Sequence, residues 1–282
     1  MRRDVFRILF ELTHKQPWLM NKQDILEHLL YDECNDDETR ELLIELINRF
    51  EYLDTDRYQE LMRLITLEIV TEPELHEKST LIAAMSIGSG VDSGQAIIYS
   101  LKVLLQEQQW TGHLAINDAM QACKTFNKNA QLHDIILVDE FVGSGQTVLG
   151  RVKAIKEQFK NSKIDSFTIR VKVLAATMSG ILNVRSQGID ITSQIIIKKG
   201  ISDFYPEEES LRKIDLMVNI EEILSKEYNE RALPSLGYGQ AEALYYRKDT
   251  NLPNSVFPIF WWSEYKNKKQ RNTLLIRAMG DA

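Results

Sequence analysis

The hydrophobic pattern of the chain changes near residue 80. Before that point apolar residues recur at helical spacing, most clearly in a helix that Asp36 or Asp37 can cap and in a second stripe from Tyr58 to Ile69 that stops before Pro73. Both stripes have the spacing of faces that pack into a core. We therefore expect an N-terminal helical region over residues 1–75.

From Thr80 onward, apolar runs of strand length alternate with helical patterns. The expected strands cover residues 81–87, 113–117, 135–139, 167–176 and 189–197. The expected helices cover residues 95–108, 147–159 and 178–185. This alternation predicts an α/β fold, a mostly parallel sheet covered by helices, with ligands at the C-terminal ends of the strands.

After Gly200 the pattern is less regular. A polar run over residues 206–209 precedes an expected helix near 215–228, and a tail rich in Gly, Pro, Asn and aromatic residues follows. We expect this tail to fold against the sheet as a hood. The predicted organisation is a helical region (1–75), an α/β core (76–200), and a C-terminal hood and tail packed on the core (201–282).

Composition narrows the classes of function. The chain has 282 residues, 44% of them hydrophobic and 27% charged, as in ordinary folded soluble proteins. No run approaches the roughly 18 apolar residues of a membrane span. The net charge of -7 argues against non-specific binding to duplex DNA. Cys34 and Cys123 are far apart and the histidines lack metal-ligand spacing, so no metal ligands are assigned and a cytoplasmic location is expected.

Candidate chemistry is concentrated between Ile135 and Thr147, where a buried strand, two acids, a small-residue turn and a helix start follow in order. Backbone N–H groups at a helix N-terminus suit a phosphate, and the carboxylates of Asp139 and Glu140 suit the hydroxyls of a ribose. They could also stabilise positive charge that develops at C1. The predicted phosphate-binding residues are Gly143, Ser144, Gly145, Gln146 and Thr147.

Two other interpretations of this segment remain open. Residues 135–140 also have the apolar run and Asp-Glu pair of a Walker B strand, but the chain contains no G-x-x-x-x-G-K-[ST] partner motif. The segment could also be a buried strand with a glycine turn and no ligand. That interpretation leaves two acids at the end of a strand unexplained.

The nine residues from Asp139 to Thr147 resemble the PRPP-binding signature of type I phosphoribosyltransferases: two acids, two apolar residues, three small residues, one variable residue and Thr. The resemblance implies that Asp139 and Glu140 hold the ribose hydroxyls and that residues 143–147 hold the 5-phosphate. It also implies a Mg²⁺ ion that helps to hold pyrophosphate.

A glycine-rich stretch over residues 86–94 matches the pyrophosphate loop of that family by its order in the chain. Its candidate ligands are Ser89, Gly90 and Ser93. The stretch departs from the family pattern because Asp92 is acidic and the basic residue often found just after that loop in working transferases is missing. A structural turn is the alternative interpretation.

The C-terminal segment contains an Asn251-Leu252-Pro253-Asn254 turn before an aromatic stretch that ends in Trp261-Trp262. Together with the Asp139 signature, this resembles the phosphoribosyltransferase-like effectors of bacterial conflict systems, over about residues 40–262. The resemblance implies that Asn251, Asn254, Trp261 and Trp262 recognise a nucleobase. An aromatic cluster that closes a small core is the alternative.

These resemblances imply a protein that binds PRPP or a nucleotide ribose 5-phosphate and acts at ribose C1, as a transferase or by cleaving an N-glycosidic bond. We expect an effector in bacterial antiphage defence, held back by a regulatory protein or a ribonucleoprotein. A catalytically inactive PRPP or nucleotide sensor and an ordinary nucleotide-salvage transferase are the alternatives. The basic run from Lys266 to Arg271 is expected to be a solvated terminal helix.

Overall fold

A computed structural model describes residues 3–86 and 93–278 and divides the chain into two compact units. One unit is continuous, over residues 56–196, and the other combines residues 1–55 with 197–282. The three parts expected from the sequence therefore differ from the observed division, because the N-terminal helices and the C-terminal tail share one unit. No helix within the described residues is long and apolar enough to cross a membrane.

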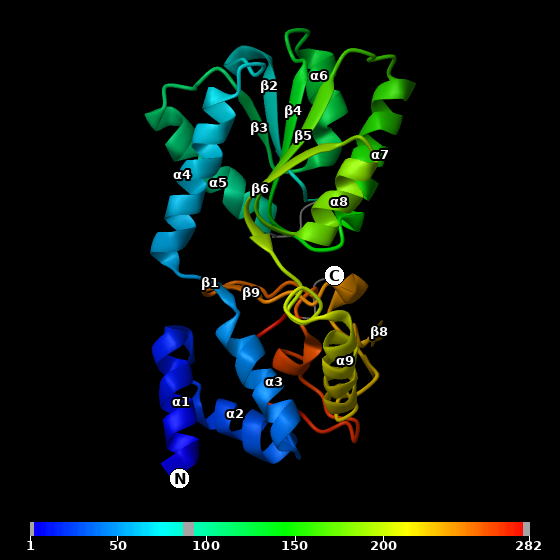
Figure 1. Cartoon of the computed structure of the whole chain (residues 1–282). Coiled ribbons are helices and arrows are strands. Elements are labelled where there is room, and N and C mark those ends of the chain that lie inside the picture. The colour runs from blue at the N-terminus through cyan, green and yellow to red at the C-terminus, as the bar shows by residue number, and fades with distance from the viewer. Residues whose placement is uncertain (1–2, 87–92, 279–282) are drawn as a thin grey trace. The chain divides into compact units, whose positions relative to one another are not determined.

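The described residues of the continuous unit hold a five-stranded sheet in the order β3, β2, β4, β5, β6 (Figure 1). The strands are β2 (Thr80–Ala84), β3 (Leu114–Ile116), β4 (Asp134–Val142), β5 (Thr168–Thr177) and β6 (Asp190–Ile197). β2 pairs in parallel with β3 and β4, and β4 pairs in parallel with β5. The predicted mostly parallel sheet is confirmed.

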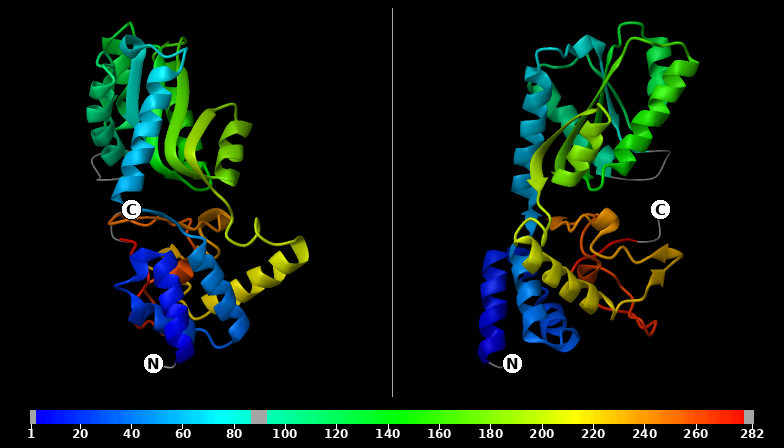
Figure 2. Two further views of the ribbon diagram at one scale, coloured as in Figure 1. Left: turned by 60° about the vertical axis from the view of Figure 1, so that its left-hand side comes forward. Right: turned by 45° about the vertical axis from the view of Figure 1, so that its right-hand side comes forward.

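Helices cover both faces of this sheet (Figure 1 and Figure 2). They are α4 (Thr55–Thr71), α5 (Ser93–Glu107), α6 (Ala122–Lys128), α7 (Gln146–Asn161) and α8 (Met178–Ser186), with the short turns η3 (Glu77–Ser79) and η4 (Ala119–Gln121). Odd-numbered strand residues such as Leu81, Leu137 and Val173 share a core with α6, α7 and α8. Because side chains alternate along a strand, even-numbered residues face the opposite side, with α4 and α5.

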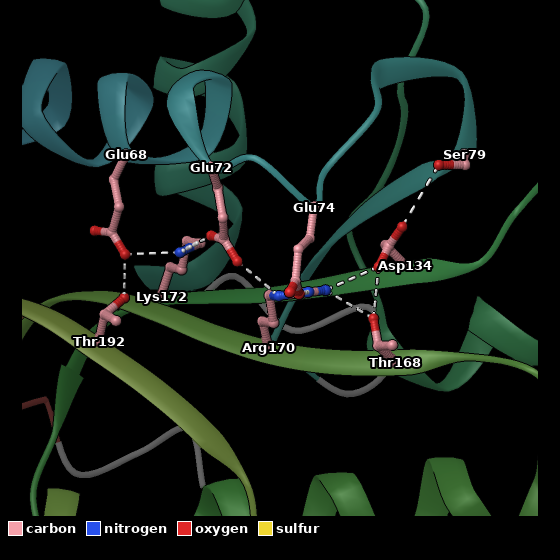
Figure 3. Close-up of polar contacts among 9 residues, drawn as sticks. All are labelled: Glu68, Glu72, Glu74, Ser79, Asp134, Thr168, Arg170, Lys172 and Thr192. Carbon is pink, nitrogen blue, oxygen red and sulfur yellow. Dashed lines mark hydrogen bonds and ion pairs between the residues drawn. The ribbon is translucent and has the colours of Figure 1, made fainter.

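An ionic network joins α4 to the sheet (Figure 3). The ammonium of Lys172, only 2% exposed, lies 2.7 Å from a carboxylate oxygen of Glu68 and 2.7 Å from one of Glu72. Two residues earlier on β5, Arg170 pairs with Glu72 at 2.7 Å and with Asp134 of β4 at 2.8 Å. Buried charges of this kind are tolerated when each is paired.

The second unit brings the two ends of the chain together. Its longer helices are α1 (Arg3–Lys15), α2 (Gln23–His28), α3 (Asp37–Asn48) and α9 (Glu207–Glu221), with the short turns η1 (Pro17–Leu19), η2 (Leu29–Glu33), η5 (Tyr238–Gln240) and η6 (Pro258–Phe260). Its strand pairs are β1 (Glu51–Leu53) with β9 (Tyr245–Arg247), in parallel, and β7 (Glu227–Tyr228) with β8 (Arg231–Ala232), antiparallel. The β1–β9 pair connects the N-terminal segment to the tail.

Two expectations about this unit were wrong in detail. The helix expected near 215–228 begins at Glu207, because three glutamates in its first turn are favourable near the positive N-terminal end of a helix. The basic run from Lys266 is not a helix but contains a bridge between Glu264 and Gln270. Arg271 is 3% exposed and pairs with Glu33 at 2.6 Å, so it does not belong to a solvated patch.

Candidate functional site

The strand order creates a topological switch between β2 and β4. From β2 the chain passes to β3 on one side and then returns to β4 on the other side of β2. Open parallel sheets bind ligands at the C-terminal ends of the strands at such a switch. The C-terminal ends of β2 and β4, with the segment from Asp139 to Thr147, therefore occupy the expected position of a ligand site.

The two acids of the signature lie within β4, which extends to Val142. Oδ1 of Asp139 accepts a hydrogen bond of 2.7 Å from the hydroxyl of Ser93 and another of 2.7 Å from the N–H of Glu140. Asp139 is partly exposed, whereas Glu140 is 4% exposed. The two acids are therefore not equivalent, and Asp139 is the more accessible to a ligand from solvent.

The small-residue turn leads into α7 through Gly145, which has a φ of +79°. Glycine adopts this left-handed conformation without the steric cost that other residues incur. Gly145 offers no side chain to cap the helix, and the first N–H groups of any helix lack intrahelical acceptors. Gln146 and Thr147 are exposed, so an anion can approach the N-terminus of α7.

α8 fixes the shape of this turn. The hydroxyl of Thr177 donates a hydrogen bond of 2.7 Å to the carbonyl of Gly143, and the side-chain amide of Asn183 donates one of 2.8 Å to the carbonyl of Ser144. A Cβ on Gly180 would lie 2.0 Å from that Gly143 oxygen, so glycine is required there. None of these contacts, from Thr177 at the end of β5 and from Gly180 and Asn183 of α8, was predicted from the sequence. The available signal was a glycine inside a predicted helix.

The predicted pyrophosphate loop is only partly described. Ser89 and Gly90 lie outside the described residues. Ser93 begins α5 and binds Asp139 through its hydroxyl. The structure therefore brings one residue of the first loop to the first acid of the signature, as expected for loops that follow neighbouring strands.

The two adjacent tryptophans lie in the core of their own unit. Trp261 is 3% exposed and Trp262 is 1% exposed. The indole N–H of Trp261 donates a hydrogen bond of 2.9 Å to the carbonyl of Val256, and that of Trp262 donates one of 3.1 Å to the hydroxyl of Ser225. Buried rings with satisfied N–H groups favour the core-closing cluster over stacking on a base.

The predicted base-reading asparagines shape the surrounding turns. Asn251 is exposed, and its side-chain oxygen accepts a hydrogen bond of 2.9 Å from the N–H of Ala278. The carbonyl of Asn254 accepts one of 2.8 Å from the N–H of Tyr238. Their role in base recognition stays a prediction.

A Mg²⁺ ion fits the candidate site only together with a ligand. Within residues 3–86 and 93–278, no three His, Cys, Asp or Glu side chains form a metal-binding group. Mg²⁺ is commonly held by one or two carboxylates plus substrate phosphates and water rather than by an all-protein cage. The carboxylate of Asp139, beside the hydroxyl of Ser93, supplies oxygen atoms of this kind.

Comparison with known proteins identifies relatives. A family model described as PRTase-CE matches residues 17–277. Xanthine-guanine-hypoxanthine phosphoribosyltransferase from Helicobacter pylori is 13% identical, with 52% of this chain and 86% of that chain covered and a TM-score of 0.33. A hypothetical protein from Neisseria gonorrhoeae with bound ppGpp is 14% identical (58% and 95% covered, TM-score 0.36). Orotate phosphoribosyltransferase from Aeropyrum pernix is 11% identical (57% and 76% covered, TM-score 0.31). A search of curated proteins finds no match.

Proposed function

Because this chain belongs to the PRTase-CE family, we propose that it binds a ribose 5-phosphate, as PRPP or as part of a nucleotide, at the C-terminal ends of β2 and β4. The observation that carries this proposal is the order of partly exposed Asp139, left-handed Gly145 and the N-terminus of α7 at the switch point of the sheet. The N–H groups of residues 143–147 donate to the phosphate. The ribose hydroxyls donate to Asp139.

The proposed chemistry takes place at C1 of the ribose. In PRPP, the bond from C1 to the pyrophosphate oxygen breaks and pyrophosphate leaves with the electron pair. A nitrogen of an acceptor base or the oxygen of a water molecule forms the new bond to C1, and any proton on that nucleophile passes to the solvent. The carboxylates of Asp139 and Glu140 stabilise positive charge at C1 as the bond breaks. A Mg²⁺ ion bound with the ligand would offset charge on the pyrophosphate.

A sensor without turnover is the second candidate function. The observation in its favour is that the glycine-rich stretch contains the acidic Asp92 and that no basic residue comes directly after it. A sensor would use the same ribose-phosphate site and lack the stabilisation of departing pyrophosphate. Incubation with PRPP, NAD or nucleotides plus Mg²⁺, followed by mass spectrometry of released base, ribose phosphate or pyrophosphate, separates an enzyme from a sensor.

The site itself is tested by ligand binding to acid variants. Asp139→Asn removes a charge-assisted acceptor, which contributes about 1.5–3 kcal/mol, so we expect PRPP affinity measured by calorimetry to fall at least tenfold. Glu140→Gln should have a smaller effect because Glu140 is buried. Asp165→Asn, an exposed acid after α7, is the matched control and should bind as the wild type does. Unchanged affinity in Asp139→Asn would exclude the ribose role.

We also propose that the protein acts as an effector in antiphage defence. The proposal rests on the combination of the Asp139 signature with the Asn251-Leu252-Pro253-Asn254 turn and Trp261-Trp262. An enzyme that consumes PRPP or nucleotides drains an essential pool, so a regulatory protein or a ribonucleoprotein would have to restrain it. An ordinary salvage transferase would need no such restraint.

A further inference from the structure

A lysine-lined groove of about 410 Å³ lies along α7, beyond the phosphate turn. Its charged wall comprises Lys153, Lys156 and Lys160, which are all exposed, and its apolar lining comprises Leu149, Val152 and Ile189. The lysines recur at intervals of three and four residues, so they form one stripe along the helix. Glu157 is the one acid among the groove's described lining residues. On a chain with a net charge of -7, this stripe is a local positive surface.

α9 carries an acidic surface. Five exposed residues follow one another at intervals of three and four: Glu208, Leu211, Asp215 and Val218 on α9, and Glu222 just after it, which also pairs with Lys226 at 2.5 Å. Acids alternate with apolar residues along this acidic stripe, and Leu211 is 59% and Val218 37% exposed. Apolar side chains at such intervals are the anchors by which a helix binds an apolar groove, and acids beside them complement basic residues at the rim of that groove.

The spacing of the two stripes matches. Successive acids on α9 are seven residues apart, about 10.5 Å along a helix, and Lys153 and Lys160 are separated by the same distance. A helix with this period can pair its acids with the lysines and place Leu211 and Val218 over the apolar lining of the groove. Single-stranded nucleic acid fits less well, because none of the described residues that line the groove is aromatic and could stack on a base.

We propose that the protein associates with itself, with the acidic stripe of α9 of one copy bound in the α7 groove of a second copy. In this contact, acids pair with lysines at the rim and apolar side chains pack at the centre. Because salt screens the charges at the rim, added salt weakens the association. The contact is heterologous, because the two surfaces belong to different helices.

Charge reversal on each side tests the contact. We expect wild-type protein in dilute salt to show a weight-average mass above the 32.6 kDa monomer by sedimentation, rising with concentration and falling with added NaCl. Lys156→Glu alone and Asp215→Lys alone should each weaken association at least tenfold. An equimolar mixture of the two variants should regain it, because each variant retains one intact surface. Lys124→Glu on α6, exposed and outside the groove, should associate as the wild type does.

Several outcomes would overturn the proposal. They are a monomer at every concentration, an oligomer that neither reversal weakens, or a mixture that associates no better than its components. Binding of a fluorescent single-stranded RNA that Lys156→Glu abolishes, without self-association, would show the groove to be a nucleic-acid site instead. Circular dichroism melts of both variants, which alter exposed residues, establish that the fold is retained.

Discussion

Glu221, at the end of α9, is a buried carboxyl whose protonation makes the stability of the folded protein depend on pH. It is 1% exposed, accepts a hydrogen bond of 2.6 Å from the hydroxyl of Ser235, and accepts another of 3.3 Å from the N–H of Leu236. Burial raises the pKa of Glu221 to about 7. In the unfolded chain the pKa is about 4.3. Between these values the folded state binds the additional proton, so its stability increases as the pH falls from 8 toward 5.

We expect Glu221→Gln to stabilise the protein at pH 8, on the order of 2 kcal/mol, because glutamine cannot bury a charge. The advantage should vanish near pH 5.5, where the wild-type carboxyl is protonated. Thermal unfolding at both pH values measures the effect, and Glu107→Gln, which alters an exposed glutamate at the end of α5, is the control. A difference between Glu221→Gln and wild type that is the same at pH 5.5 and pH 8 would contradict the assignment.

At the scale of single residues, the small-residue turn was located correctly from the sequence, but the reason for its glycine was only partly predicted. The small-residue turn over residues 143–147 was predicted to approach a phosphate closely, and Gly145 within it has a φ of +79°. A Cβ there would meet the Gly180 carbonyl oxygen and a methyl of Val184, both at 2.9 Å. The close approach is therefore to α8. Packing between segments 35 or more residues apart leaves no local pattern to detect.

At the scale of elements, α4 is attached to the sheet through charges as well as apolar contacts. Lys172 lies between Glu68 and Glu72, and the hydrogen bonds from Lys172 and Thr192 help to lower the pKa of Glu68 against the opposing effect of its burial. A carboxyl with a lowered pKa contributes stability above its unfolded pKa and loses it as the pH falls. This pH dependence is opposite to that of Glu221.

Lys172→Met should therefore destabilise the sheet unit strongly, by about 3–5 kcal/mol, because it leaves Glu68 without its cation and leaves Glu72 with Arg170 alone. Urea unfolding measures the loss. Lys102→Met, which alters an exposed lysine on α5, should change stability by less than about 0.5 kcal/mol. Equal effects of the two substitutions would show that the network contributes no net stability.

Most elements were predictable because their patterns are local. The strand expected at 167–176 is Thr168–Thr177, and the helix expected at 147–159 is Gln146–Asn161. The alternation of Arg170 and Lys172 with apolar residues predicts a strand, but the same alternation is typical of a strand with one solvated face. That α4 covers this face with carboxylates depends on tertiary packing, which the strand's own sequence does not encode.

At the scale of the whole molecule, the two-unit division was not predicted. Hydrophobic patterning locates the change from helical to alternating structure near residue 80, but it says nothing about which distant segments associate. The N-terminal part joins the tail partly through two three-residue strands, β1 and β9. Strands this short have no periodicity that sequence reasoning can detect.

The effector proposal is also tested at this scale, in the cell. We expect expression of the chain alone to slow bacterial growth and to lower PRPP or nucleotide pools, because an unrestrained enzyme consumes them. Asp139→Asn, expressed to the same level, should be harmless. Coexpression with genomic neighbours should restore growth until phage infection. If the wild-type chain is harmless, the pools stay level and no neighbour binds it, an ordinary metabolic transferase is the better description.

The pairing of β1 with β9 also determines when the second unit can complete its fold during translation. Leu53 emerges early, but its partner Arg247 follows roughly 190 residues later. At the usual 5–20 residues per second, the N-terminal helices wait about 10–40 s for the tail, while the continuous sheet unit can fold as it emerges. A nascent chain interrupted before β9 therefore lacks the completed second unit. Any function that requires that unit begins only after β9 has been translated.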